Sequence, residues 1–420
     1  MKRGLGIFAL VLVGATPPAS ASELHSWHDP HDLPLAASVR SAVVQQHDAP
    51  IQEAPDAKSR RRGSALGGAL LPVYGATRGP GCDGRWLQIG PLAWICQDAV
   101  TLSSLEPVDR DDRSHVIAEH GLPYRYFFVG KDGSWAYGSL RDADEAVPEQ
   151  QLEPGFAVAG VDLKTKGIER YVLTSHNRWV PLRDLSGPAR PFLFQGQSVE
   201  DGRLDFAWVV VDNARIYSRP DLTARTKATR SRFELVPVLE TKQSRGERFV
   251  RIDEQSWLRA RDLRQPTSAP PPDEILPGER WIDIELATQT LVLYEGDRPI
   301  FATLVSTGRG AQGTERATPK GVHRIWVKLR TTNMSNLSDE DATRLYAIED
   351  VPYVQFFSKG VGLHAAFWHR SFGFEKSQGC VNLAPLDAQK LFELTSPRLP
   401  AGWHAALPTS LEEGTVVRVR

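Results

Sequence analysis

The sequence predicts a mainly β protein that is divided into several domains. The chain has 420 residues, more than one small domain usually holds. Its 30 prolines and 34 glycines favour many turns over long helices. Short runs alternate apolar and polar residues, as in 281–286, and this period of two is typical of strands with one buried face.

The overall charge excludes one class of partner. Fifty lysines and arginines stand against 51 aspartates and glutamates, a formal net charge of -1. Such a chain lacks the overall positive field that holds a polyanion, so we predict no nucleic-acid partner.

Residues 1–21 have the three parts of a secretory signal: a basic start at Met1–Arg3, an apolar run at Leu5–Val13 and small residues at Ala19–Ala21. The apolar run is shorter than the roughly 20 residues that span a bilayer, and no later run approaches that length, so no membrane span is predicted. We expect an exported protein, periplasmic or associated with the cell wall, in which disulfides persist.

Residues 22–65 mix His, Pro, Ala and charged residues without hydrophobic periodicity. This composition predicts a disordered leader. The basic cluster at 58–62 is expected to be solvated, as charge runs usually are.

Internal similarity organises the next part of the chain. Three segments end in a Trp, an apolar residue and an Asp in the same register, starting at Trp94, Trp179 and Trp257. The stretch around the third resembles a bacterial SH3-like module, a small β-barrel. The resemblance implies binding to cell-wall peptides, with a spacer role as the alternative. We expect an SH3-like module at 66–105, a divergent β module at 106–205 and an SH3-like module at 206–264.

The three cysteines are too few for a disulfide scaffold and wrongly arranged for a four-ligand zinc site, so no metal site is predicted. Cys82 and Cys96 flank two strand-like runs with a Gly-Pro turn, a hairpin that can meet disulfide geometry. Closing this loop of about 15 residues would contribute about 3 kcal/mol, the alternative being two buried free thiols. Cys380 is left without a partner.

A Pro-rich linker at 265–278 precedes the last domain, 279–420, which opens with a hairpin. A G-x-G-x-x-G pattern is formed by Gly308, Gly310 and Gly313. A nucleotide site needs a helix after the last glycine, whereas the next residues contain Pro319 and Gly321. We therefore predict a glycine loop between strands and no nucleotide site.

Cys380 follows Gly379 and lies near His364 and His369 in sequence. A thiol attacks as the thiolate, and an imidazole can take its proton. Main-chain N–H groups at such a turn can stabilise an oxyanion. The alternative for an unpaired cysteine is a small buried apolar residue.

The stretch that contains these residues resembles the active-site signature of the L,D-transpeptidase (YkuD) family. His364 and Cys380 are 16 positions apart, and the Ser, Gly and Asn of the signature stand at 377, 379 and 382. Residues 318–321 match the family's Thr-Pro-x-Gly, and 306–308 its Ser-x-Gly turn. The resemblance covers 279–420 and implies a β-sandwich catalytic domain.

The resemblance also implies roles. Cys380 would be the nucleophile and His364 the proton donor and acceptor, without metal or cofactor. Gln378 stands where the family has a second His, and Gln carries no proton in this range. The supporting residues would be Ser377, Gln378, Gly379 and Asn382. The substrate-binding residues would be Tyr353, Phe367, Trp368 and His369.

The implied activity is that of a peptidoglycan L,D-transpeptidase. It would crosslink third-position diaminopimelate residues of stem peptides through a thioester on Cys380, and carbapenem-type inhibitors would acylate the same sulfur. The alternatives are an L,D-carboxypeptidase with the same Cys and His, and a non-catalytic protein that binds the cell wall.

Overall fold

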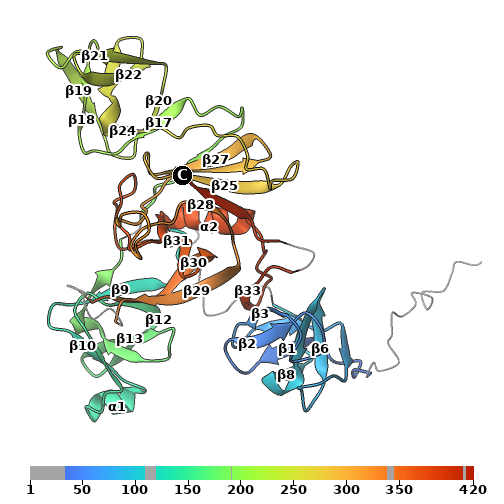
Figure 1. Ribbon diagram of the computed structural model, residues 1–420. Helices are drawn as coiled ribbons and strands as arrows, with labels where there is room; N and C mark the ends of the chain where they lie inside the picture. Colours follow the sequence, from blue (N-terminus) through green and yellow to red (C-terminus); the bar gives the residue numbers. More distant parts are fainter. Residues whose placement is uncertain (1–33, 109–119, 191, 338–344, 410–412) are drawn as a thin grey trace, which may run out of the picture.

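The computed structural model describes residues 34–108, 120–190, 192–337, 345–409 and 413–420 (Figure 1). The predicted signal sequence lies outside the described residues. The fold is mainly β, as predicted, and the two α-helices within these ranges are α1 (Leu140–Asp144) and α2 (Pro385–Leu394). In the described ranges, neither helix has the length and apolar character needed to cross a membrane.

The first module consists of two sheets around a core that includes Ala42, Ile51, Leu71, Leu87 and Ile95. One sheet has the order β4-β1-β8, and the other runs β3-β2-β7-β6-β5. The strands are β1 (Ser41–Val44), β2 (Ala49–Gln52), β3 (Arg61–Ala65), β4 (Leu70–Pro72), β5 (Gly75–Thr77), β6 (Trp86–Gly90), β7 (Ala93–Cys96) and β8 (Val100–Ser103).

The prediction of a disordered leader is wrong for residues 41–65, which form β1 to β3. Their apolar residues are few, so no local periodicity appears, and some of their partner strands, such as β7 and β8, come later in the chain. Strand β3 pairs with β33 (Trp403–Ala406). Arg62, expected to be solvated, is 9% exposed and donates to the carbonyl oxygen of Leu407 at 2.7 Å. The first module therefore starts near residue 41 rather than 66.

The predicted disulfide is confirmed: Cys82 and Cys96 are bonded. Strands β6 and β7 form the expected hairpin, in which Leu87 faces Ile95. Cys82, Cys96 and Asp98 bring three ligand-type atoms together. Since the disulfide occupies both sulfurs, this group offers no thiolate to a metal.

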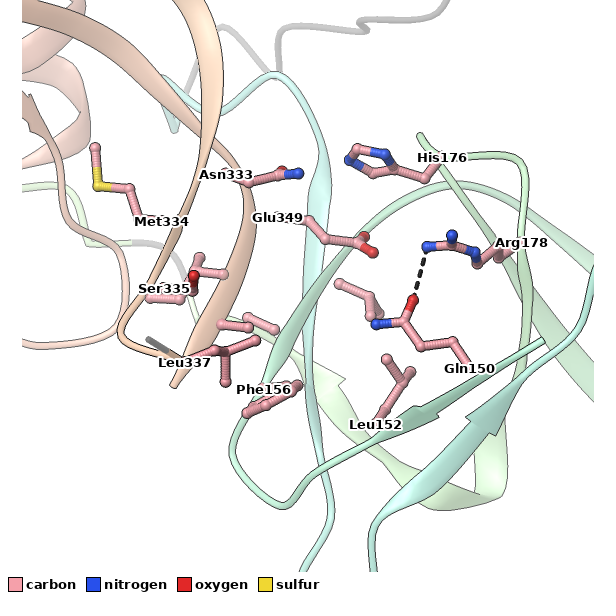
Figure 2. A pocket seen from close by; sticks show the side chains of 14 residues that line it. Gln150, Leu152, Phe156, His176, Arg178, Asn333, Met334, Ser335, Leu337 and Glu349 are labelled. Carbon is pink, nitrogen blue, oxygen red and sulfur yellow. Dashed lines mark hydrogen bonds between the residues drawn. The ribbon is translucent and has the colours of Figure 1, made fainter. Parts of the chain in front are cut away.

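The middle module contains α1 and the strands β9 (Arg125–Val129), β10 (Ser134–Ala136), β11 (Gln150–Leu152), β12 (Ala157–Lys166), β13 (Glu169–Thr174), β14 (Trp179–Pro181) and β15 (Leu185–Pro188). Strand β12 pairs in parallel with β30 (Ala347–Ser358) through Ala157 and Ile348. A cavity of about 190 Å³ lies at this joint, where Arg178 donates to Gln150 at 2.7 Å (Figure 2).

The predicted boundary of the middle module at 205 is wrong. Its last strand ends at Pro188, and β16 (Gln197–Ser198) pairs with β27 (Arg298–Leu304) of the C-terminal domain. The local sequence around β16 does not identify this pairing, because the partner strand is some hundred residues away.

The third module has two sheets, ordered β20-β17-β24 and β19-β18-β23-β22-β21. Its core includes Ala207, Ile216, Val250 and Leu258. The strands are β17 (Phe206–Val209), β18 (Ala214–Tyr217), β19 (Thr226–Arg230), β20 (Leu235–Pro237), β21 (Glu240–Ser244), β22 (Glu247–Asp253), β23 (Ser256–Arg259) and β24 (Leu263–Arg264).

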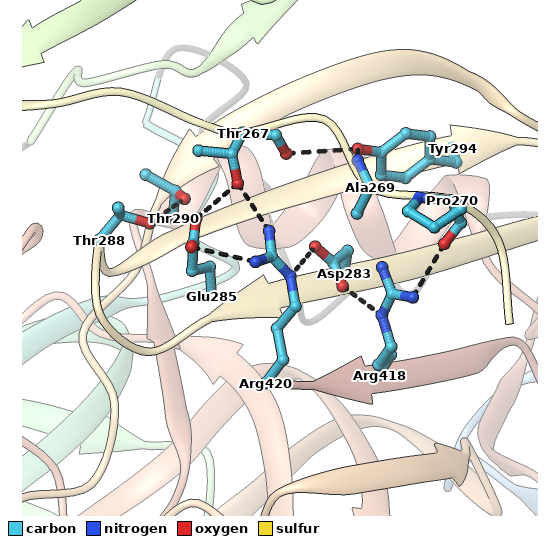
Figure 3. Close-up of polar contacts among 10 residues, drawn as sticks. All are labelled: Thr267, Ala269, Pro270, Asp283, Glu285, Thr288, Thr290, Tyr294, Arg418 and Arg420. Carbon is cyan, nitrogen blue, oxygen red and sulfur yellow. Dashed lines mark hydrogen bonds and ion pairs between the residues drawn. The ribbon is translucent and has the colours of Figure 1, made fainter.

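The Pro-rich linker is fastened to the C-terminal sheet (Figure 3). Buried Asp283 forms ion pairs with Arg418 at 2.6 Å and Arg420 at 2.8 Å. The two arginines also donate to the linker, Arg418 to the Pro270 carbonyl oxygen at 2.8 Å and Arg420 to the Thr267 hydroxyl at 2.7 Å. The linker is thus an extended segment docked on the sheet.

The C-terminal domain is the predicted β-sandwich. One sheet has the order β16-β27-β26-β25-β34-β28, and the other contains β29 to β32. Side chains such as Ile282 and Leu291 meet Leu363, Val381 and Leu391 between the layers. The remaining strands are β25 (Arg280–Glu285), β26 (Thr290–Glu295), β28 (Gly321–Arg324), β29 (Val327–Ser335), β31 (Val361–Ala365), β32 (Val381–Leu383) and β34 (Val416–Val419).

The glycine pattern at 308–313 lies between β27 and β28, and no helix forms from 305 to 320. The prediction of a glycine loop between strands is therefore confirmed.

Candidate active site

The strand register places His364 beside the strand that Cys380 directly precedes. Strands β31 and β32 are parallel, with His364 opposite Asn382. Because side chains alternate along a strand, Leu363 and Val381 enter the core while His364 and Asn382 face the other way. Cys380 directly precedes β32, in the turn that leads into this strand. The cysteine therefore lies at the start of the strand that neighbours the one carrying His364.

Cys380 is partly buried, and its sulfur lies 3.7 Å from the carbonyl oxygen of Gly360. Burial raises the pKa of the thiol above its ordinary value, and a backbone hydrogen bond at Gly362 offsets part of this effect. The sulfur is therefore protonated at neutral pH and needs a base before it can attack.

His364 is buried, and its Nδ1 lies 2.9 Å from the carbonyl oxygen of Ala365. A carbonyl oxygen can only accept, so Nδ1 carries the proton and Nε2 is the free basic nitrogen. Burial lowers the pKa of His364 to about 4, so the ring is neutral at pH 7. The Ala365 carbonyl was missed by sequence reasoning, since a main-chain acceptor has no residue signature.

Two hydroxyl groups hold the turn that carries the cysteine. Ser377 donates to the carbonyl oxygen of Cys380 and accepts from the N–H of Gly379 at 3.1 Å. Thr318 donates to the carbonyl oxygen of Gly379 at 2.6 Å and accepts from the N–H of Gly308 at 2.9 Å. Gly379 has a φ of 125°, which L side chains rarely adopt. The predicted supporting roles of Ser377 and Gly379 agree with this geometry.

Replacing Thr318 by valine is expected to destabilise the fold by about 1–3 kcal/mol, because Gly308 N–H and Gly379 C=O both lose a buried partner. Urea unfolding measures this change. The turn should also hold the sulfur less well, so acylation of Cys380 by a carbapenem, the inhibitor class expected above, should slow about tenfold. Thr318→Ser keeps the hydroxyl and is the matched control; equal rates for the valine variant and the wild type would contradict a positioning role.

Asn382 and His369 are hydrogen-bonded beside His364. The side-chain amide of Asn382 lies 2.8 Å from Nε2 of His369, and its main chain exchanges two 3.0 Å hydrogen bonds with Ser306. The N–H of Ser371 donates to Nδ1 of His369 at 3.1 Å. Burial lowers the pKa of His369 to about 4, so this ring is also neutral at pH 7.

The aromatic residues predicted to bind substrate do not all lie in the same part of the structure. Trp368 is partly exposed and stacks on the His364 ring, 5.8 Å between centroids and 22° between planes. Phe367 is 8% exposed and stacks on Tyr126 of the middle module, so it packs between domains instead of facing an open groove.

Tyr353 is not brought to the cysteine. Its ring packs against the ring of Phe392 in α2, with 5.7 Å between the ring centroids. Together with Arg330 and Arg398, it lines a cavity of about 290 Å³. Burial raises the pKa of its hydroxyl. The sequence places Tyr353 before the motif but cannot tell on which side of β30 it stands. Gln378, in the catalytic turn itself, has an exposed side chain.

Residues 279–419 match the sequence profile of the L,D-transpeptidase catalytic domain, YkuD. Among solved structures, the chain is similar to a mutant of Enterococcus faecium L,D-transpeptidase, with 22% identity over 34% of this chain and 50% of that one, and a TM-score of 0.25. A second, L,D-transpeptidase (Yku) from Stackebrandtia nassauensis, has 28% identity over 35% and 58%, with a TM-score of 0.25.

A third structure is the catalytic domain of the E. faecium L,D-transpeptidase acylated by ertapenem, with 24% identity over 34% of this chain and 97% of that one, and a TM-score of 0.25. The chain spans about half the length of the first of these structures. No curated protein matches the sequence.

Proposed function

Taking residues 279–419 as an L,D-transpeptidase catalytic domain (YkuD), we propose that the protein is a peptidoglycan L,D-transpeptidase with Cys380 as its nucleophile and His364 as its base. The observation that carries the proposal is the hydrogen bond from Nδ1 of His364 to the Ala365 carbonyl oxygen, at 2.9 Å. It leaves Nε2 of His364 unprotonated, on the strand that pairs with β32, which Cys380 directly precedes.

In the first half-reaction, Nε2 of His364 takes the thiol proton as the sulfur attacks the carbonyl carbon of the third residue of a tetrapeptide stem. The C–N bond to the terminal D-alanine breaks. The imidazolium returns its proton to the leaving amine, and a thioester remains on Cys380.

In the second half-reaction, an amine of another stem attacks the thioester carbon. His364 takes a proton from this amine, the C–S bond breaks, and the sulfur regains a proton from the imidazolium. The product is a peptide bond between third-position diaminopimelate residues. The acceptor stem therefore replaces D-alanine, and no net oxidation occurs.

The geometry supports an active enzyme over a non-catalytic binder despite Gln378. Its side chain is exposed, and the buried base and its carbonyl partner are both supplied by β31. Export fits the same function, since the Cys82–Cys96 disulfide is typical of an oxidising compartment.

Mass spectrometry of the folded protein after incubation with ertapenem tests the nucleophile. We expect one adduct, on the peptide that contains Cys380; its absence would argue against both enzymatic functions. Product analysis with a disaccharide-tetrapeptide then separates the reactions. A crosslinked dimer supports transpeptidation, whereas release of D-alanine without dimer identifies a carboxypeptidase.

A further inference from the structure

The segment that joins the proposed base to the nucleophile contacts the middle module. It leaves β31 after Ala365 and returns at the catalytic turn, and its first aromatic residue is Phe367. This ring is buried in a cluster with Tyr126, Ala157 and Val351, so it packs against β9 and β12 of the middle module as well as β30.

Tyr126 is held from three sides. Its ring is 1% exposed and stacks on Phe367 with 3.9 Å between centroids and 26° between planes. Its hydroxyl donates to the carbonyl oxygen of Asp350 in β30 at 2.6 Å, and its carbonyl oxygen accepts from Ala189 N–H at 2.7 Å. A side chain of the middle module is thus fixed to the catalytic domain by a hydrogen bond and by ring packing.

Ring contacts continue from Tyr126 to the imidazole. Phe367 meets Trp368 edge to face at 5.0 Å and 86°, and Trp368 stacks on His364. The hydrogen bond to Ala365 fixes one edge of the imidazole, and the indole covers its face. Displacing a reacting group by about 1 Å can cost roughly 100-fold in rate, so what holds Trp368 matters for the chemistry.

We propose that Tyr126 is a positioning residue for the reaction at Cys380: its ring holds Phe367, and through it Trp368 and the imidazole of His364. The inference rests on the proposed function. Tyr126 does not act on protons itself, because burial and nearby Asp350 raise the pKa of its hydroxyl well above the ordinary value.

The test compares three variants of the full chain. Tyr126→Leu removes the ring, Tyr126→Phe keeps the ring without the hydroxyl, and Tyr171→Leu removes a buried ring elsewhere in the same module, on β13. For transfer between tetrapeptide stems, we expect kcat to fall about 30- to 100-fold in Tyr126→Leu while KM changes less than about threefold. Tyr126→Phe should restore kcat to within about threefold of the wild type, and Tyr171→Leu should leave it near the wild-type value.

Thermal unfolding of each variant shows that it is folded at the assay temperature. Equal kcat values for Tyr126→Leu and Tyr171→Leu, both folded, would overturn the inference, as would an equal loss in Tyr126→Phe and Tyr126→Leu. Failure of the proposed function is recognised separately, because the wild type itself would then give neither an ertapenem adduct nor a transfer product.

Discussion

Replacing Cys380 by alanine is expected to remove transfer activity and the ertapenem adduct together. No other sulfur can substitute, because Cys82 and Cys96 are joined in a disulfide. Loss of a covalent nucleophile lowers kcat by at least roughly 10⁴-fold. The free energy of unfolding should change by less than about 1 kcal/mol, since alanine keeps Cβ and the sulfur's contact with the Gly360 carbonyl is long, at 3.7 Å.

The matched control removes the two disulfide-bonded cysteines and keeps Cys380. A double Cys82→Ser, Cys96→Ser variant should lose about 3 kcal/mol of stability while Cys380 still reacts. Urea unfolding and intact-protein mass spectrometry measure the two quantities on each variant. Crosslinks formed by the folded Cys380→Ala protein would disprove the thioester mechanism.

The pH dependence of acylation should have its acid limb near 4. Burial lowers the pKa of His364 to about 4, below the ordinary value near 6.5, so the ring stays neutral and basic until the pH falls through about 4. Burial also raises the pKa of the Cys380 thiol, so no thiolate forms at neutral pH without the base. We therefore expect the rate with ertapenem to be nearly constant from about pH 5 to 8 and to fall below that range.

His364→Gln is the control for this assignment. Glutamine can hydrogen-bond but cannot take the thiol proton, and removing a general base costs about 10²- to 10⁴-fold. The variant's residual rate should lack the acid limb and rise with pH as the thiolate forms. A limb near pH 6.5 in the wild type would show instead that His364 is solvated, and an unchanged limb in His364→Gln would assign it to another group.

The residues proposed as nucleophile and base, and the turn before β32, could be singled out from sequence because the proposed chemistry depends on residue type and spacing. The 16-residue interval between His364 and Cys380 corresponds to the parallel pairing of β31 with β32. Ser377 and Thr318 could be found for the same reason, since each lies in a short motif. The Ala365 carbonyl could not, because any residue supplies one.

The contacts between domains could not be predicted from the local sequence pattern. Tyr126 is an ordinary strand aromatic in sequence, and only its stacking on Phe367 connects it with the site. Tyr353 was predicted at the site because it precedes the motif, but its ring faces Phe392 on α2. The leader at 41–65 was misjudged for a related reason: β2 and β3 pair with each other, but β8, β7 and β33, with which the segment also pairs, come later in the chain.

Strand β33 lies between β3 of the first module and β29 of the catalytic domain, which imposes an order on synthesis and folding. The Arg62–Leu407 hydrogen bond spans 345 positions. The edge of β3 therefore stays unpaired until β33 has been synthesised. Contacts of such long range form slowly and leave a strand edge open to association with other chains in the meantime. The first module is thus completed long after its own strands have been synthesised.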